Sequence, residues 1–107
     1  MTVATVDPWI ALSDRTRRSV LWLVVERPRS VTELAAELPV TRPAVSQHLK
    51  VLSDAQLVTG MQSGRQRIYR ARPDGLRAVR DELERFWSQT LLNFKHLAEQ
   101  TGQKGPS

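Results

Sequence analysis

Cysteine is absent from the 107 residues of this sequence. Disulfide bonds, thiolate metal ligands, thiol nucleophiles and sulfur redox switches are therefore excluded. Long apolar runs are also absent, because the longest uncharged one covers only residues 20–25, whereas a membrane helix needs about 20 such residues. Residues 1–6 lack the basic region and the apolar block of a signal peptide. We therefore expect a soluble, cytoplasmic protein with no membrane partner.

The length and composition favour one small globular domain. Hydrophobic residues make up 40% of the chain and charged residues 25%, a balance typical of folded proteins. A chain of this length builds one ordinary domain more readily than a catalytic and a regulatory one. We predict a single domain over residues 1–100 and a disordered tail over residues 101–107, which are polar and include two glycines and a proline.

The positive charge is concentrated in one part of the chain. The net charge of +5 comes from 16 basic and 11 acidic residues. Residues 41–72 hold six of the basic residues and one acidic residue, Asp54, so the remainder of the chain is neutral. A basic stretch of this kind is typical of a surface that binds a polyanion.

Start and stop signals predict four helices in the first half of the chain. Asp7 and Pro8 begin a short helix, and a second one, which either Ser13 or Asp14 caps, runs to about residue 27. The apolar face of this second helix consists of Val20, Leu21, Val24 and Val25. Ser30 and Glu33 form a capping box that begins a third helix, which ends near residue 38. A tight turn precedes a fourth helix, which Thr41 caps. The third and fourth helices therefore form a helix-turn-helix.

The fourth helix has one apolar face and one polar, basic face. Val45, Leu49 and Leu52 recur at spacings of four and three, which places them on the buried side. The opposite side carries hydrogen-bonding and cationic groups without a carboxylate. It consists of Arg42, Pro43, Ser46, Gln47 and Lys50. Such a face can lie against DNA bases and phosphates without charge repulsion.

A basic β-hairpin follows the fourth helix. Residues 57–62 and 65–72 have the composition of two strands around Ser63 and Gly64. Alternation places Arg65 and Arg67 on one side and Ile68 on the other, so Ile68 anchors the hairpin while both arginines stay free. We interpret the hairpin as a wing beside the helix-turn-helix.

A long amphipathic helix of about 25 residues, about 40 Å in length, follows Pro73 and Asp74. Its apolar stripe contains three of the aromatic residues, more than the core of a small domain can cover, so we expect it to pair with a second copy of the chain. The predicted dimer residues on this helix are Leu83, Phe86, Trp87, Leu91 and Phe94.

These elements make up a mainly α-helical winged helix-turn-helix with about five helices and a small β-hairpin. At this point the sequence resembles the ArsR-type bacterial repressors. The residues that carry the resemblance are Leu12-Ser13-Asp14-Arg15-Thr16-Arg17-Arg18, Val31-Thr32-Glu33-Leu34-Ala35, Arg42-Pro43-Ala44-Val45-Ser46-Gln47-His48-Leu49-Lys50-Val51-Leu52, Leu57-Val58 and Gly64-Arg65-Gln66-Arg67-Ile68-Tyr69.

The resemblance implies a homodimer that binds double-stranded DNA. In it, the first and last helices pair, which adds Trp9 to the dimer interface, the fourth helix enters the major groove, and the wings follow the flanking backbone. It also implies a repressor that occupies an inverted-repeat operator, its own promoter included. The predicted DNA-binding residues are Thr41, Arg42, Pro43, Ser46, Gln47, His48, Lys50, Arg65 and Arg67.

The metal ligands of this family are missing. Its metal sensors carry Cys-x-Cys where this chain has Ser30-Val31-Thr32. His96 and Glu99 match only the second half of a family metal site on the last helix, and Leu83 and Arg85 occupy the positions of the other ligands. Two ligands fall short of the four that zinc prefers. We expect no metal and no cofactor, and the sequence identifies no inducer.

Alternatives remain for the site and for the function. Ser46 and Gln47 could simply solvate a helix surface, and His48 could either pack beneath the wing or touch the DNA backbone. An enzyme is not expected, because Ser46 and His48 do not face each other on one helix. The second candidate function is a dimeric protein-interaction module, such as an antitoxin, whose last helix binds another protein.

Overall fold

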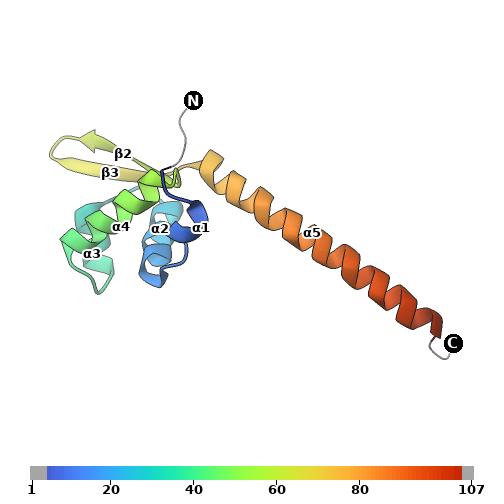
Figure 1. Cartoon of the computed structure of the whole chain (residues 1–107). Helices are drawn as coiled ribbons and strands as arrows, with labels where there is room; N and C mark the ends of the chain where they lie inside the picture. Colours follow the sequence, from blue (N-terminus) through green and yellow to red (C-terminus); the bar gives the residue numbers. More distant parts are fainter. Residues whose placement is uncertain (1–4, 105–107) are drawn as a thin grey trace. The chain divides into compact units, whose positions relative to one another are not determined.

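The computed structural model describes residues 5–104, with side chains as far as Thr101. The chain clusters into two compact units, Met1–Arg77 and Ala78–Ser107, and the predicted single domain over residues 1–100 stays a prediction. In chain order the elements are α1 (Pro8–Ala11), α2 (Arg15–Glu26), β1 (Arg29–Ser30), α3 (Val31–Glu37), α4 (Arg42–Asp54), β2 (Val58–Ser63), β3 (Gln66–Ala71) and α5 (Pro73–Lys104) (Figure 1).

Polar caps determine where the first four helices begin. Asp7, Asp14 and Thr41 accept backbone N–H bonds of 2.7, 2.8 and 3.3 Å from the first turns of α1, α2 and α4. At α3, Ser30 Oγ accepts from the Glu33 N–H and the Glu33 carboxylate accepts from the Ser30 N–H, both at 3.1 Å. These bonds satisfy N–H groups that a helix start leaves unpaired, and they confirm the predicted helix starts.

The apolar residues of α2, α3 and α4 form the core of the first unit. In α4, Val45, Leu49 and Leu52 are fully buried, as predicted. The fully buried or nearly buried apolar side chains elsewhere are Ala11, Val20, Leu21, Val24, Leu34, Ala55, Leu57 and Val58. The sequence also placed Val25 on the buried face, but its side chain is 41% exposed. That prediction was wrong because each residue turns the helix by about 100°, which places Val25 beyond Leu21, at the edge of the buried face.

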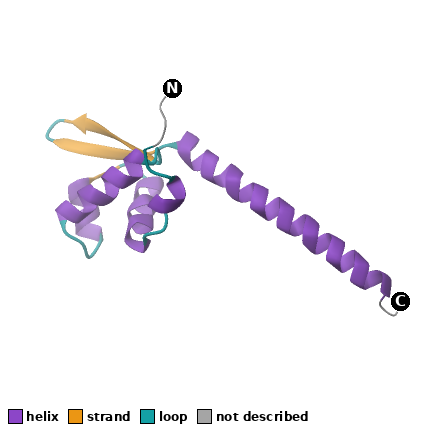
Figure 2. Cartoon of the chain, viewed as in Figure 1, coloured by secondary structure: helices purple, strands orange, loops and turns teal. Residues whose placement is uncertain are grey.

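The predicted hairpin is confirmed, and a third strand joins it. The sheet is antiparallel with the order β1-β3-β2, and β2 and β3 form the two long strands drawn in orange in Figure 2. In β1, Arg29 pairs with Tyr69 and Ser30 with Ile68 of β3. Strand β1 was not predicted, because two residues are too few to show the alternation of a strand. This pairing joins the wing to the start of α3.

The turn between α3 and α4 accommodates Pro39 without a left-handed residue. Leu38 has φ −117° and Thr41 has φ −77°, and within residues 5–104 only Gln56 and Gly64 have positive φ. Proline requires a negative φ, and this turn contains no described residue with a positive one. The first unit is thus a winged helix-turn-helix.

The last helix is longer than predicted. It has 32 residues, about 48 Å at 1.5 Å per residue, and continues to Lys104 through part of the predicted tail. Thr101 Oγ1 donates to the Leu97 carbonyl at 2.9 Å, and the predicted disorder of residues 101–107 stays a prediction. Residues 105–107 lie outside the described residues. Every helix within residues 5–104 is too short or too polar to cross a membrane.

Candidate nucleic-acid interface

The outer face of α4 presents the polar residues that the sequence assigned to DNA. Burial of Val45, Leu49 and Leu52 against the core fixes the rotation of the helix. The side opposite these three residues is therefore exposed. Its exposed members are Thr41, Arg42, Pro43, Ser46, Gln47 and Lys50. This face has the donors and acceptors that bind base edges and phosphates.

His48 lies at the edge of this face and is half-buried. Its Nδ1 atom is buried and has no hydrogen-bond partner in the described part of the chain. The backbone N–H of Arg17 holds the pKa of Asp14, at the start of α2, below its usual value. The contact of His48 with DNA stays a prediction.

The cations of the candidate interface differ in how they are paired. Lys50 Nζ forms an ion pair of 3.0 Å with Asp54 one turn later on α4. Arg42, Arg65 and Arg67 form no ion pair with the described residues of the chain. Because Lys50 must exchange its carboxylate for a phosphate, we expect it to contribute less to DNA binding than these arginines.

Two arginines of the wing, which comprises β2, β3 and their turn, have different surroundings. Arg65 lies in the turn after Gly64, where a φ of +61° favours glycine. Arg67 is exposed, but the prediction that its side chain is free was wrong, because its Nη2 donates to the Gly60 carbonyl at 3.3 Å. The Arg67 guanidinium also lies over the Tyr69 ring, 5.8 Å from its centre. The wing therefore orients the Arg67 guanidinium before any ligand binds.

A hollow of about 390 Å³ lies where the wing meets the starts of α3 and α4. We call it the wing–helix hollow. Its lining residues are Ser30, Val31, Thr32, Arg42, Pro43, Ser46, Arg65, Gln66 and Arg67. It brings together five of the nine predicted DNA-binding residues, whereas Thr41, Gln47, His48 and Lys50 are outside its lining. Two distant parts of the sequence thus share one basic surface.

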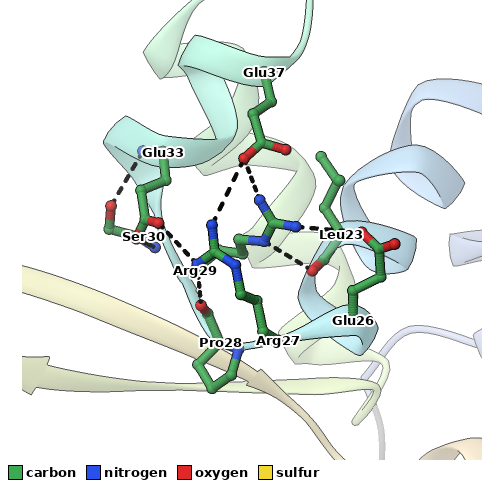
Figure 3. A network of polar contacts seen from close by, with 8 residues as sticks. All are labelled: Leu23, Glu26, Arg27, Pro28, Arg29, Ser30, Glu33 and Glu37. Carbon is green, nitrogen blue, oxygen red and sulfur yellow. Dashed lines mark hydrogen bonds and ion pairs between the residues drawn. The ribbon is translucent and has the colours of Figure 1, made fainter.

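A buried arginine that was not predicted, Arg29, precedes Ser30 in the lining of the wing–helix hollow. The Arg29 side chain is 7% exposed, and its Nε donates to the Leu23 carbonyl at 3.1 Å. Its guanidinium also pairs with Glu26 at 3.2 Å and with Glu37 (Figure 3). An arginine next to a proline carried no signal of burial. The network joins the end of α2 to α3 while the Arg29 backbone pairs with the wing.

Ser30 and Thr32 were also missed as parts of the candidate interface. Ser30 was predicted only as a helix cap, and both residues line the wing–helix hollow. Hydrogen bonds from the Ser30 N–H and from Arg27 hold the pKa of Glu33 below its usual value, so Glu33 stays charged as part of the cap. The sequence did contain a signal for them, because Ser30 and Thr32 stand where the metal sensors of the family have functional cysteines.

The described residues do not fit a metal site of the kind found in the resembled sensors. Ser30 is 2% exposed and its hydroxyl caps α3. His96 and Glu99 are exposed on α5. Within residues 5–104, no three His, Asp or Glu side chains gather in a group that could hold a metal ion.

The predicted dimer residues of α5 are exposed side chains on one helix. Their exposed fractions run from 47% at Leu91 to 68% at Phe94. Leu83, Phe86 and Trp87 lie between these values. Trp9, on α1 of the first unit, is 36% exposed. Apolar side chains exposed in a continuous stripe are typical of a surface that another molecule covers.

Comparisons with known proteins agree with this architecture. Residues 12–60 match a family model described as a helix-turn-helix domain. The chain is 47% identical over 94 residues to the HTH-type transcriptional regulator Rv2034 of Mycobacterium tuberculosis, and the match covers 88% of each chain.

Two solved structures are similar along most of their length. One is described as a "Possible transcriptional regulator for arsenical resistance", with a TM-score of 0.72, 40% identity, and coverage of 78% of this chain and 86% of the other. The second is an ArsR-like transcriptional regulator from Rhodococcus sp. RHA1, with a TM-score of 0.69, 35% identity, and coverage of 85% and 89%. The chain belongs to the ArsR-type family of helix-turn-helix transcriptional regulators.

Proposed function

We propose that this protein is a homodimeric repressor that binds an inverted-repeat operator, its own promoter included, and excludes RNA polymerase from it. The observation that carries the proposal is the joint position of Arg42, Arg65 and Arg67 around one hollow beside the polar face of α4. Arginine binds phosphate through a planar fork of donors. A regulator that binds the chromosome of a bacterium acts in its cytoplasm.

The residues of the interface divide into two roles. Ser46 and Gln47 lie on the exposed face of α4, and their donors and acceptors suit base edges in the major groove. Arg42, Lys50 and the wing arginines neutralise phosphates. Thr41, Pro43 and His48 flank the first group and complete the surface that meets the DNA.

A two-fold axis through α5 and α1 supplies the symmetry. The exposed apolar stripe of α5 and the exposed Trp9 support pairing of these helices between two copies. The two recognition helices then lie one DNA turn apart, so half-site centres are about 10 base pairs apart or a whole multiple of this spacing.

DNA binding at several salt concentrations tests the proposal. Four cations per protomer neutralise about eight phosphates, which gives a slope of log affinity against log salt of about −7. If Lys50 keeps its bond to Asp54, three cations per protomer give a slope of about −5. A slope near zero would contradict the mechanism.

Substitution of single residues tests the two roles. We expect Gln47→Ala to reduce the preference for the selected operator over mutated ones about 5- to 100-fold, because it removes base contacts. We expect Arg65→Gln to weaken binding to all duplexes alike, because a phosphate contact carries no sequence information. The reverse outcome would show that the roles are assigned wrongly.

The exposed stripe of α5 also supports the second candidate, a module that binds a different protein. That function predicts a stoichiometric protein partner and no DNA footprint. The proposed repressor predicts a footprint from the purified protein alone. Catalysis is not part of either proposal, and the inducing signal is open to direct screening with the purified dimer.

A further inference from the structure

All the charged side chains that line the wing–helix hollow are cationic. Arg42, Arg65 and Arg67 line it, and the other lining residues are neutral. Its volume of about 390 Å³ is many times the roughly 30 Å³ share of one water molecule and lies within the range of sites that bind small groups. Three cations without a carboxylate among the lining residues repel one another unless an anion lies between them.

We propose that the wing–helix hollow receives one particular phosphate of the DNA backbone in each half-site, held by Arg42 from α4 and by Arg65 and Arg67 from the wing. This inference rests on the proposed DNA-binding function and makes it more specific. It turns three separate phosphate contacts into one shared site, which fixes the distance between the wing and the recognition helix on DNA.

The chemistry of the lining favours a phosphate over a base edge. Guanidinium groups form paired, charge-assisted hydrogen bonds with phosphate oxygens. The lining adds hydroxyl side chains from Ser46 and Thr32, which donate to the same kind of acceptor. Gln47, the residue best suited to an adenine edge, lies outside the lining. The hollow and the base-contacting face are therefore adjacent but separate.

Gly60 and Tyr69 position one of the three arginines. A Cβ atom on Gly60 would come within 2.7 Å of Arg67 Nε and 2.8 Å of the Tyr69 ring. The absence of a side chain there leaves room for the guanidinium to lie over the ring and to bond to the Gly60 carbonyl. A cation that is ordered before binding loses less conformational entropy when it meets its phosphate. Gly60 and Tyr69 are thus positioning residues.

The opposite wall of the hollow is also fixed in the protein alone. Ser30 pairs with Ile68 of β3 and caps α3, so the wing strand and the helix start move together. Beside it, the buried Arg29 bonds to Leu23, Glu26 and Glu37 (Figure 3). The hollow is therefore formed before DNA arrives.

The test combines a modified duplex with protein variants. A tight-binding duplex is first selected from a random pool with the wild-type protein. Each phosphate in one half-site is then replaced in turn by a neutral methylphosphonate. We expect one position at which wild-type affinity falls about 10-fold or more, the size of a charge-assisted contact. At this position Arg42→Gln and Arg65→Gln should each reduce the effect of the methylphosphonate to less than about 3-fold.

Two control variants separate the shared site from general electrostatics and from folding. Arg77→Gln removes the same charge from an exposed residue outside the hollow and should keep the full 10-fold effect. Gly60→Ala should reduce the loss of affinity that the methylphosphonate causes, whereas Thr59→Ala should leave this loss unchanged. Thr59 is exposed on the same strand as Gly60. Tyr69→Leu provides a second test of positioning if the alanine variant fails to fold, as judged by its circular dichroism spectrum.

The outcomes distinguish this inference from the proposed function. Tight, salt-dependent binding with methylphosphonate effects spread evenly over many positions would overturn the shared site and leave the repressor proposal intact. Failure to select any duplex would overturn the proposed function itself. Inorganic phosphate provides the remaining arm, monitored by NMR shifts of the lining residues without DNA. Saturation below about 1 mM would assign the hollow to a free anion and overturn the DNA assignment.

Discussion

Two helices of this protein, α4 and α5, share one sequence pattern but differ in burial. In α4, the apolar residues at spacings of three and four are fully buried, as at Leu49. In α5, apolar residues at the same spacings are about half exposed or more, as at Leu91 and Trp87. The pattern identifies residues that share a face, whereas burial depends on what packs against that face.

We expect the apolar faces of α4 and α5 to be covered by different partners. The face of α4 packs against α2 and α3 within the first unit, so one chain completes this part of the core. The described part of the second unit, residues 78–104, belongs to one helix, and within these residues nothing else packs against its stripe. We therefore expect the partner of α5 to be a second copy of the chain.

The largest effect is expected from a charge placed in the α5 stripe. Trp87→Glu puts one unpaired carboxylate from each copy into the proposed interface, which should weaken dimerisation about 1,000-fold or more. Because a monomer contacts only one half-site, affinity for the operator should fall with it. Analytical ultracentrifugation gives the mass, and a gel-shift titration gives the affinity.

Ser88→Glu is the matched control for this substitution. Ser88 follows Trp87 on α5 and adds the same charge, but it lies away from the apolar stripe. We expect this variant to remain dimeric and to bind DNA nearly as well as the wild type. Equal loss in both variants would mean that charge alone, rather than the apolar face, determines assembly.

An intermediate effect is expected from shortening one apolar residue on each helix. Leu49→Ala leaves a cavity in a fully buried site and should lower the free energy of unfolding by about 2–5 kcal/mol. Leu91→Ala should instead raise the dissociation constant of the dimer. Thermal unfolding at several protein concentrations separates the two, because loss at the interface depends on concentration. A concentration-independent loss in Leu91→Ala would contradict the proposed partner.

The smallest effect is expected from the helix caps of the first unit. The pKa of Asp14 is lowered, first by the N–H bond from Arg17. A lowered pKa in the folded state stabilises the fold above the unfolded value of 3.8, and this stability is lost as pH falls through the folded value. We expect the melting temperature to fall between pH 5 and pH 3 by less in Asp14→Ser than in the wild type.

Serine at position 14 keeps the cap of α2 and removes the titrating group, because its hydroxyl accepts the same N–H bond without titrating. Asp14→Ala, which removes both the bond and the charge, should melt lower than Asp14→Ser at pH 7. If both variants keep the full acid dependence of the wild type, the Asp14 cap is not its source.

Much of the fold could be predicted from local signals. The caps Asp7, Ser30 and Thr41 are each followed by their helix as predicted, and Asp14 is the cap of α2 where the sequence left Ser13 and Asp14 open. These starts are predictable because a cap acts on N–H groups two or three residues away. The exposed face of α4 followed from its periodicity. The strand β1 could not be predicted, since its pairing with β3 joins residues far apart in the chain.

The candidate site was predictable as a set of residues but not as a shape. Charge distribution selected Arg42, Arg65 and Arg67, yet their meeting around one hollow depends on tertiary packing. The burial of Arg29 was not predicted for the same reason, because its partners Glu26 and Glu37 lie on two different helices. The residues near a charged side chain in the sequence do not predict which distant groups will neutralise it.

Hydroxyl-radical footprinting of the purified protein on the selected duplex shows whether two copies bind DNA with two-fold symmetry. We expect two protected tracts related by this symmetry, with centres about 10 base pairs apart or a whole multiple of this distance. A single asymmetric tract bound by one copy of the chain, or uniform protection without preferred positions, would contradict this expectation.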